Sequence, residues 1–385
     1  MHFTRREFGK LALAGLPAAA LGTPLFAAQA KPNSKFGNVQ IGVITYSYRS
    51  MPEQTAEATL QYVLGSGISG IELMDGPVEN YLGRPAQAGR GGPGGGGGRR
   101  GGGGDAPAGP TPYEQLLAGT MPTCAPGQGR AGAPPAGAPR AGGPGGPGGP
   151  GGGGRGTPTP EALAAAEELR KWRTSVSLDK VKALRKMYND AGVSIYAYKA
   201  DGLQKNLQTT NEELDYLFTV AAALGATHTT MELPNAGPDG AALIKRMAQF
   251  AEKHKIYVAY HTHAQGSMTA FDEALAMSRW NMSNVDLGHY VAAGNNGGTP
   301  LQFLERHHAR IASFHLKDRT LPEHCSLTTP FGMGDGHIKD ILLLMKKNKW
   351  TFPATIELEW PVPADSDAVK EVRKGVEFAR TVLTA

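Results

Sequence analysis

Short runs of apolar and β-branched residues alternate along the chain with segments whose apolar positions repeat every three to four residues. The runs predict strands and the periodic segments predict amphipathic helices. Strands are expected at residues 39–45, 68–74, 193–198, 227–233, 256–261, 284–287, 311–316 and 354–358. Helices are expected between them, for example at 212–224, 240–253 and 338–348, with a last helix at 367–383. This alternation is typical of βα units and a parallel sheet.

Eight strands with intervening helices predict an α/β chain of the (β/α)8 TIM barrel type over residues 38–385. A doubly wound sheet is the main alternative. The segment after the start of the first strand, residues 42–47, reads Gly-Val-Ile-Thr-Tyr-Ser and lacks a glycine-rich phosphate-binding turn. The barrel is therefore the favoured fold.

Glycine and proline change this picture between the second and third strands. The chain of 385 residues has 53 glycines and 28 prolines, and both concentrate in residues 84–158. Such a composition buries too little apolar surface to offset the entropy of ordering, so we expect a disordered low-complexity insertion, with one helical turn at 113–121. The insertion would extend from the face of the barrel where active sites form. It would act as a lid over the site or be a tolerated insertion without a function.

Residues 1–30 carry the features of a twin-arginine signal peptide. Residues 4–10 read Thr-Arg-Arg-Glu-Phe-Gly-Lys, and an apolar run at 11–20 and a small-residue site at 28–30 follow. We therefore expect export of the folded protein to the periplasm. A membrane anchor is the alternative, but the apolar run is shorter than the roughly 20 residues that span a bilayer. The mature form is expected to have no membrane span.

Charge and cysteine content exclude several classes of protein. The net charge of +5 comes largely from arginines in the signal and the glycine-rich block, so no nucleic-acid partner is expected. Two cysteines, Cys124 and Cys325, are too few for a disulfide framework or a Cys-rich zinc module. They could form one disulfide in an oxidising compartment, but the sequence does not show whether they meet. The sequence leaves open whether the chain forms a homo-oligomer.

Histidines and carboxylates mark the ends of the later strands. Ten of the 11 histidines lie between His228 and His337. Ligand-type residues end four consecutive strands: His261 and His263, Asp286 and His289, His315, and Glu357 with Glu359. A lone histidine on a strand is most often a core residue, but strand ends of a parallel barrel converge on one axial site. Imidazoles with carboxylates suit one divalent ion, Mn²⁺, Mg²⁺, Co²⁺ or Zn²⁺.

The order of these motifs resembles the xylose isomerase-like barrel family, which holds sugar isomerases, epimerases, inosose dehydratases and an AP endonuclease branch. The motifs lie at residues 42–49, 67–73, 260–263, 285–289, 314–318, 334–336 and 356–357. Each is short, but they keep their order on successive strands. The resemblance covers nearly the whole chain after residue 38, except the glycine- and proline-rich block.

The resemblance implies a metal site of Asp286, His315 and Glu357, with His261 as the ligand from the fifth strand. Sugar isomerases of the family often have a glutamate at this fifth-strand position, as a second acid/base opposite the glutamate of the eighth strand. His261 departs from that pattern. Glu232, at the end of the fourth strand, would replace the missing carboxylate or merely cap a helix. The histidine pair on the fifth strand is similar to inosose dehydratase-type members.

The resemblance also implies roles for the surrounding side chains. The catalytic set is Glu357, His261, His289 and Glu232, and the substrate-binding set is His263, Lys317, Arg319, Trp360 and Tyr46. His289 would touch a substrate hydroxyl or carry a proton. Lys317 and Arg319 would neutralise an oxyanion, unless Lys317 pairs with Glu359. Trp360 and Tyr46 would line a sugar face or only pack.

These features predict a divalent-metal-dependent isomerase or epimerase for a non-phosphorylated sugar or keto-sugar. The ion would polarise a carbonyl and stabilise the enediolate formed by loss of the neighbouring proton. A lyase or dehydratase that eliminates water or an alcohol from a keto-sugar or keto-glycoside is the first alternative, and a non-catalytic periplasmic sugar-binding protein is the second. A DNA-repair nuclease is disfavoured, because its additional metals need histidines on early strands, whereas residues 73–74 and 198–199 are Leu-Met and Tyr-Lys.

Overall fold

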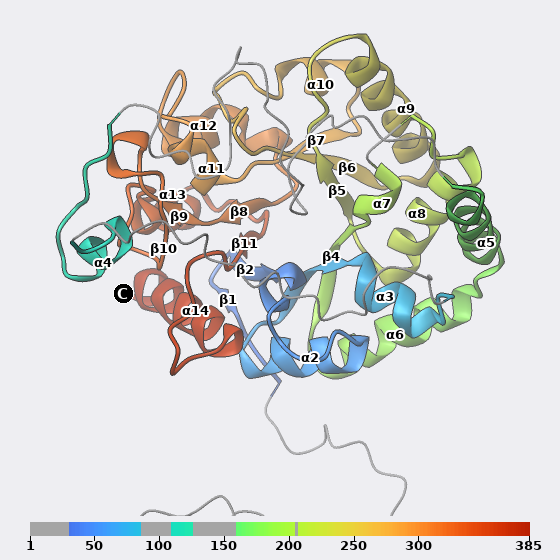
Figure 1. Cartoon of the computed structure of the whole chain (residues 1–385), viewed down its shortest axis with the longest axis horizontal. Helices are drawn as coiled ribbons and strands as arrows, with labels where there is room; N and C mark the ends of the chain where they lie inside the picture. Colours follow the sequence, from blue (N-terminus) through green and yellow to red (C-terminus); the bar gives the residue numbers. More distant parts are fainter. Residues whose placement is uncertain (1–30, 86–108, 126–158, 205–206) are drawn as a thin grey trace, which may run out of the picture. The chain divides into compact units, whose positions relative to one another are not determined.

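Eight parallel strands and the helices between them form a nearly closed barrel in the computed structural model of the chain (Figure 1). The structure describes residues 31–85, 109–125, 159–204 and 207–385. The barrel strands are β2 (Val39–Ile44), β3 (Gly70–Met74), β4 (Ser194–Lys199), β5 (His228–Glu232), β6 (Tyr257–His261), β7 (Asn281–Asn284), β8 (Phe314–Leu316) and β11 (Ala354–Ile356). They are ordered β7-β6-β5-β4-β3-β2-β11-β8. Parallel bridges at Ser283–Ile311 and Asp286–His315 join the two ends. The predicted (β/α)8 barrel is confirmed.

Helices surround the strands, as Figure 1 shows. They are α2 (Ala56–Gly65), α3 (Asp75–Leu82), α5 (Pro160–Ser175), α6 (Leu178–Asp190), α7 (Asp201–Gln204), α8 (Asn211–Leu224), α9 (Pro238–His254), α10 (Asp272–Met277), α11 (Leu287–Ala292), α12 (Pro300–His307), α13 (Ile338–Asn348) and α14 (Ala368–Thr384). Short elements complete the fold: β1 (Lys35–Phe36), which pairs with β2, the hairpin of β9 (Asp318–Arg319) and β10 (Thr328–Thr329), and the 3-10 turns at Thr45–Tyr48, His308–Arg310 and Pro322–His324.

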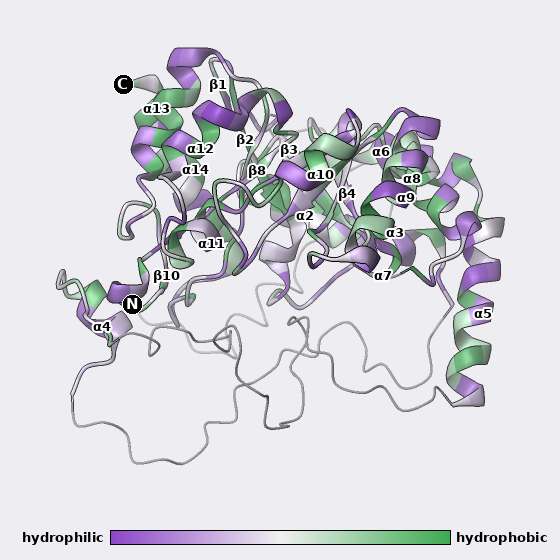
Figure 2. Cartoon of the chain, turned by 90° about the horizontal axis from the view of Figure 1, so that it is seen from above, coloured by the Kyte–Doolittle hydropathy of each residue, from purple (hydrophilic) through white to green (hydrophobic). Residues whose placement is uncertain are grey.

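The ends of α8 illustrate why the sequence folds locally as it does. The Thr210 hydroxyl accepts from the backbone N–H of Glu213, whose side chain accepts from the N–H of Thr210, and Gly225 ends the helix with φ of 81°. The side chains capping the first turn satisfy donors that the helix leaves free, and glycine adopts a left-handed conformation without steric cost. Hydrophilic and hydrophobic residues alternate along the outer helices (Figure 2), because each helix buries one face on the barrel.

The sixth barrel strand was misplaced by the sequence pattern. Residues 284–287 were expected to form it, but β7 is Asn281–Asn284, and Leu287 already begins α11. Asp286 is the N-cap of that helix and accepts a hydrogen bond from the His289 backbone N–H at 2.6 Å. The strand was missed because polar residues lie on both of its faces, so β7 reads Asn-Met-Ser-Asn and shows no apolar run.

The inserted segment is described only in its middle. Residues 86–108 and 126–158 lie outside the described residues, so the disorder expected for them stays a prediction. Between them, residues 109–125 contain α4 (Pro112–Leu117), near the helical turn expected at 113–121. Cys124 and Cys325 form a disulfide across 201 residues of sequence, which answers the question that the sequence left open.

The signal peptide expected at residues 1–30 also lies outside the described residues, and export stays a prediction. None of the helices in the part of the chain that the structure describes has the length and apolar content to span a bilayer.

Candidate metal centre at the barrel mouth

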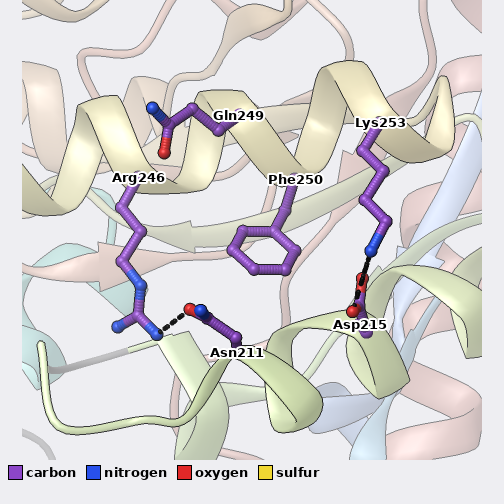
Figure 3. Close-up of a pocket in the computed structure, with 6 residues that line it drawn as sticks. All are labelled: Asn211, Asp215, Arg246, Gln249, Phe250 and Lys253. Atoms are coloured by element: carbon purple, nitrogen blue, oxygen red, sulfur yellow. Dashed lines mark hydrogen bonds and ion pairs between the residues drawn. The ribbon is translucent and has the colours of Figure 1, made fainter.

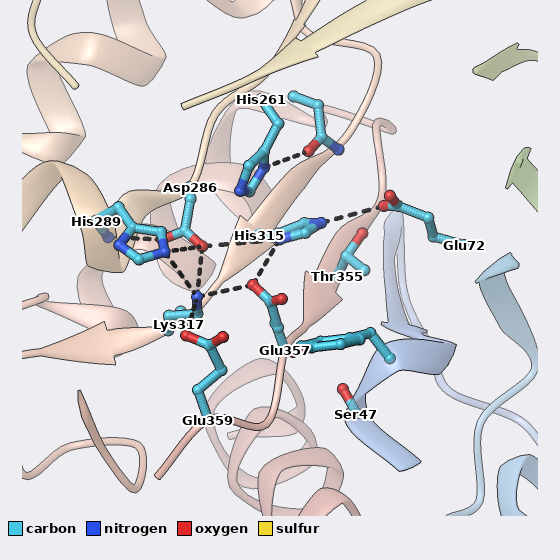
Figure 4. A network of polar contacts seen from close by, with 12 residues as sticks. Ser47, Glu72, His261, Asp286, His289, His315, Lys317, Thr355, Glu357 and Glu359 are labelled. Atoms are coloured by element: carbon cyan, nitrogen blue, oxygen red, sulfur yellow. Dashed lines mark hydrogen bonds and ion pairs between the residues drawn. The ribbon is translucent and has the colours of Figure 1, made fainter. Parts of the chain in front are cut away.

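The carboxyl ends of four neighbouring strands bring His261, Asp286, His315 and Glu357 together. In register, His261 pairs with Asn284 at the end of β7, and Asp286 forms a bridge with His315. One ligand atom from each of the four side chains lies within 4.8 Å of the other three. All four side chains are buried and point toward one another (Figure 4). The convergence expected from the strand ends is therefore present.

His315 lies at the centre of the group between carboxylates. Its Nδ1 is 2.9 Å from Glu357 Oε2 and 3.7 Å from Asp286 Oδ2, and its Nε2 is 3.2 Å from Glu72 Oε2. Burial by itself would lower the pKa of His315, but the charges of Glu357 and Glu72 outweigh it and raise that pKa well above its usual value. Burial likewise raises the pKa of Glu72, but the charge of His315 outweighs it, and the pKa falls to about 2.

His261 is held as a neutral imidazole by a chain of hydrogen bonds. Its Nδ1 lies 3.0 Å from Asn284 Oδ1, and Asn284 Nδ2 donates to Ser313 Oγ at 2.7 Å. Since the amide oxygen can only accept, the ring proton is assigned to Nδ1 and the lone pair to Nε2. Burial outweighs the nearby Glu232 charge and lowers the pKa of His261 to about 4. The neutral form is the one that binds metals.

Lys317 is fully buried among three carboxylates. Its Nζ lies 2.9 Å from Asp286 Oδ2, 2.7 Å from Glu357 Oε2 and 2.8 Å from Glu359 Oε2. Burial would lower the pKa of Lys317, but these carboxylates outweigh it and raise that pKa. In turn, Lys317 holds the pKa values of Asp286 and Glu357 well below their usual range, although burial opposes this. The pairing with Glu359 is one of the two roles expected for Lys317.

The donor set suits a divalent cation of borderline character. Two imidazoles and two carboxylates are ligands of Mn²⁺, Co²⁺ and Zn²⁺. Among the described atoms, Asp286 Oδ2 is buried and accepts no hydrogen bond, although the Lys317 ammonium lies close to it. Glu72 beside His315 Nε2 and Asn284 beside His261 Nδ1 are partners of the kind that orient metal-binding histidines. These residues fit one metal ion.

A second group of side chains lies next to these four. His263 Nδ1 is 3.0 Å from Glu232 Oε2, and Glu232 Oε1 accepts from Lys199 Nζ at 3.1 Å. Burial lowers the pKa of His263, but the hydrogen bond to Glu232 outweighs it and raises that pKa. The His263 side chain is 40% exposed, so its imidazole is held by Glu232 and still faces the mouth. The ligand atoms of His261, His263 and His289 also lie within 4.8 Å of one another.

Arg319 and Lys317 face the two ring nitrogens of His289. Arg319 Nη1 donates to His289 Nδ1 at 2.8 Å, and Lys317 Nζ lies 3.3 Å from His289 Nε2. Since both side chains can only donate, each ring nitrogen faces a donor. Burial, together with the charge of Lys317, lowers the pKa of His289 well below its usual value. The rings of His263 and His289 have centroids 4.6 Å apart. Arg319 is thus bound to a histidine, and its expected role toward a substrate oxyanion stays a prediction.

The aromatic residues expected to line the sugar have other partners. Trp360 is buried, packs on Phe331 with ring centroids 5.9 Å apart, and donates from Nε1 to Glu371 Oε2 in α14 at 3.2 Å. Tyr46 is partly exposed and lies under the Arg49 guanidinium, 4.4 Å from the ring centroid. These contacts favour packing, the second of the two roles expected for them.

Three residues of the site were missed in the sequence. Glu72 contacts His315, Lys199 contacts Glu232, and Asn284 contacts His261. A signal for Glu72 was present, because it is the one charged residue of the otherwise apolar β3, Gly-Ile-Glu-Leu-Met. A carboxylate in a buried strand requires a partner, and that requirement marks it as a site residue.

A surface groove between α8 and α9 was considered as an alternative site (Figure 3). Its cations already have partners within the groove: Arg246 Nη2 donates to Asn211 Oδ1 at 2.8 Å, and Lys253 Nζ to Asp215 Oδ1 at 2.7 Å. Phe250 supplies an apolar wall between these two pairs. We therefore place the candidate site at the barrel mouth.

Comparisons with known proteins agree with the fold. No curated protein matches the sequence. The chain is similar to D-psicose 3-epimerase from Clostridium cellulolyticum H10, with TM-score 0.52, 8% identity, and coverage of 90% of this chain and 99% of that one. It is similar to the probable 3-DHS dehydratase AsbF, involved in petrobactin synthesis, from Bacillus anthracis, with TM-score 0.51, 12% identity, and coverage of 88% and 98%. A sugar phosphate isomerase/epimerase from Parabacteroides distasonis ATCC 8503 has TM-score 0.50, 14% identity, and coverage of 93% and 97%.

Identities this low show a shared fold. The family follows from a sequence profile, described as the xylose isomerase-like TIM barrel, that matches residues 162–382, more than half of the chain. The resemblance read from the strand-end motifs is thereby confirmed, and the chain belongs to the xylose isomerase-like TIM barrel family.

Proposed function

We propose that the protein is a divalent-metal-dependent isomerase or epimerase that moves a proton beside the carbonyl of a non-phosphorylated sugar or keto-sugar. The observation that carries the proposal is the buried group of His261, Asp286, His315 and Glu357, whose ligand atoms lie within 4.8 Å of one another. Sugar epimerases and a dehydratase among the proteins of similar fold support the reaction class, since both start with loss of a proton beside a carbonyl.

These four residues would hold the ion. A divalent cation supplies Lewis-acid chemistry, which lowers the cost of negative charge on a substrate oxygen when the adjacent carbon loses its proton. The chain prepares the ligands for it: Glu72 and Asn284 each hold one ring nitrogen of a histidine, and the other nitrogen faces the group. Such partners fix the tautomer and the orientation of a ligand.

Two histidines are placed to move the proton. His263 is held through Nδ1 by Glu232, so its Nε2 would accept a proton from the substrate carbon. His289 is held through Nδ1 by Arg319, and Lys317 Nζ lies 3.3 Å from its Nε2; in this proposal Nε2 carries the proton that is donated to the substrate. One acceptor and one donor on neighbouring rings suit transfer between adjacent atoms of a sugar. In this proposal Glu232 orients His263 and does not itself accept the proton.

The charges at the mouth support an uncharged substrate. Lys317 is surrounded by three carboxylates, Lys199 contacts Glu232, and Arg319 contacts His289. A phosphate group would have to compete with these partners for the cations. A sugar or keto-sugar with neutral hydroxyl groups has no such requirement.

One observation favours elimination as a second candidate. Glu357 Oε2 lies 2.7 Å from Lys317 Nζ and 2.9 Å from His315 Nδ1, so both neighbours would have to move before Glu357 accepted a proton. Without this carboxylate as a second base, elimination becomes the competing outcome: His263 removes the proton beside the carbonyl, and the β-oxygen takes a proton from His289 and leaves as water or an alcohol.

Incubation of the mature, Mn²⁺-loaded protein in D₂O with free ketohexoses and keto-glycosides tests both candidates. Deuterium beside the carbonyl in a product of unchanged composition supports isomerisation or epimerisation, and release of water or an alcohol supports elimination. Asp286→Asn should lose the metal and the turnover. Asp272→Asn, which removes an exposed partner of Arg306, should keep both. Binding of these sugars without either product would refute the enzyme and favour a sugar-binding protein.

We also propose that the protein is exported to the periplasm. The twin-arginine pattern at residues 4–10 supports this, as does the disulfide between Cys124 and Cys325, because disulfides persist in oxidising compartments. Residues 1–30 fused to a folded reporter should carry it to the periplasm, and replacing both arginines with lysine should stop export. A reporter that stays in the cytoplasm with the native signal would overturn the proposal.

A further inference from the structure

The tip of the β9–β10 hairpin has an uncommon backbone, and two links join it to residues 109–125. Cys325 and Ser326 both have left-handed backbones, with φ of 73° and 48°, which residues other than glycine adopt uncommonly and at a cost. Cys325 forms the disulfide with Cys124, and the Cys124 N–H donates to Glu323 O at 2.9 Å. Residues 109–125 are therefore joined to the hairpin tip by a covalent bond and a hydrogen bond side by side.

Ser326 connects this tip to the candidate site. Its carbonyl oxygen accepts from Arg319 Nη2 at 2.6 Å, and its hydroxyl donates to Ala292 O at the end of α11 at 3.3 Å. The same guanidinium donates from Nη1 to His289 Nδ1 at 2.8 Å, and His289 lies in α11. The contacts form a closed path from Cys325 through Ser326 and Arg319 to His289, and back along α11.

The base of the hairpin is held by different contacts. The Asp318 carboxylate accepts three backbone N–H groups of the loop at 332–336, at 2.8, 3.1 and 3.0 Å. The Leu321 N–H donates to Asp335 Oδ2 at 2.7 Å. Because Cys325 takes no part in these contacts, loss of the disulfide is expected to loosen the tip at 322–327 and to leave the base in place.

We propose that the Cys124–Cys325 disulfide is a positioning element of the candidate site. It keeps the Ser326 carbonyl where Arg319 binds it, and Arg319 in turn holds the Nδ1 side of the His289 ring. Arg319 and the disulfide act through His289, so they are positioning groups. The catalytic role of His289 rests on the proposed function. The orientation of its ring is independent of that function.

The test compares the mature protein with the variant Cys124→Ser/Cys325→Ser, which removes the disulfide without leaving a free thiol. Selective ¹⁵N labelling of histidine reports which ring nitrogen of His289 carries the proton, with His289→Gln to assign the signals. Hydrogen exchange of the peptides that cover 318–329 reports the hairpin. Thr111→Ala is the matched control, because it removes the cap of α4 and leaves the disulfide intact.

We expect the double variant to exchange at least about tenfold faster at residues 322–327, since local opening governs exchange there. Exchange in β3–β5 should stay unchanged, as evidence of an intact barrel. The His289 signals should move toward those of Arg319→Gln, and Thr111→Ala should leave them in place. Unchanged His289 signals in the double variant would overturn the proposal and reduce the disulfide to a tether for the insertion. Neither measurement needs turnover, so failure of the proposed reaction would not be mistaken for failure of this inference.

Discussion

Lys317 allows the electrostatics of the site to be tested without a known substrate. Its ammonium lies within 2.9 Å of oxygens of Asp286, Glu357 and Glu359, and its side chain is fully buried. Lys317→Met keeps the aliphatic stem, which packs on Gly288, and removes the charge. In metal-free protein the variant leaves two buried ligand carboxylates, Asp286 and Glu357, with the His315 imidazole as the remaining positive group beside them.

Removing one partner of a buried ion pair costs about 3–5 kcal/mol, because the remaining charge stays desolvated. At roughly 2.1 cal/mol/K of unfolding entropy per residue over a barrel of about 300 residues, this corresponds to a melting temperature lower by about 5–8 °C. In the Mn²⁺-loaded protein the decrease in melting temperature should be smaller, because a divalent cation neutralises the same carboxylates. The metal-induced rise in melting temperature should therefore be larger in the variant than in the wild type.

Calorimetry of EDTA-treated and Mn²⁺-loaded protein measures both effects. Lys374→Met is the matched control: its ammonium lies 2.7 Å from Glu371 Oε1, but the side chain is 67% exposed, and exposed pairs contribute about 1 kcal/mol or less. If Lys317→Met costs no more than Lys374→Met in the metal-free protein, the carboxylates do not depend on this lysine and the reasoning is wrong.

Three further predictions concern the surroundings of the site. Glu72→Gln keeps an acceptor for His315 but removes the charge, and it should weaken Mn²⁺ binding about 10- to 100-fold; equal affinities by titration calorimetry would contradict this. Burial lowers the pKa of His228 from 6.5 to about 4, so its contribution to stability is complete above pH 6.5 and is lost as the pH falls toward 4. Between pH 7 and pH 5 the wild type should lose about 2 kcal/mol more than His228→Gln in urea unfolding, and equal losses would refute the assignment. Gly42→Ala places a Cβ against the Tyr196 ring and should lower the free energy of unfolding by about 1–3 kcal/mol. Tyr196→Phe in the same chain should restore part of this loss; an equal loss in that background would show that the clash is elsewhere.

The errors of the sequence reading share a physical cause. The strand at 284–287 was misplaced because both faces of β7 carry polar side chains: Asn284 donates to Ser313 Oγ on one face, and Ser283 donates to the Arg310 carbonyl on the other. The apolar pattern that marks most strands is absent from such a strand. Glu72 was overlooked because its partner, His315, is 243 residues away in sequence, and a motif read within one strand does not show contacts across the barrel.

The sequence by itself determined the alternation of strands and helices and the residue types at the strand ends, because both depend on local periodicity. It also determined that His261, Asp286, His315 and Glu357 would share one end of the barrel, since parallel strands present their carboxyl ends on the same face.

Only the tertiary structure decided how these side chains are paired. Barrel closure and register place Lys317 among carboxylates, Glu72 on the second nitrogen of His315, and Cys325 beside a cysteine 201 residues away. Such contacts depend on where distant segments cross and on the direction of each side chain, and local sequence carries neither quantity.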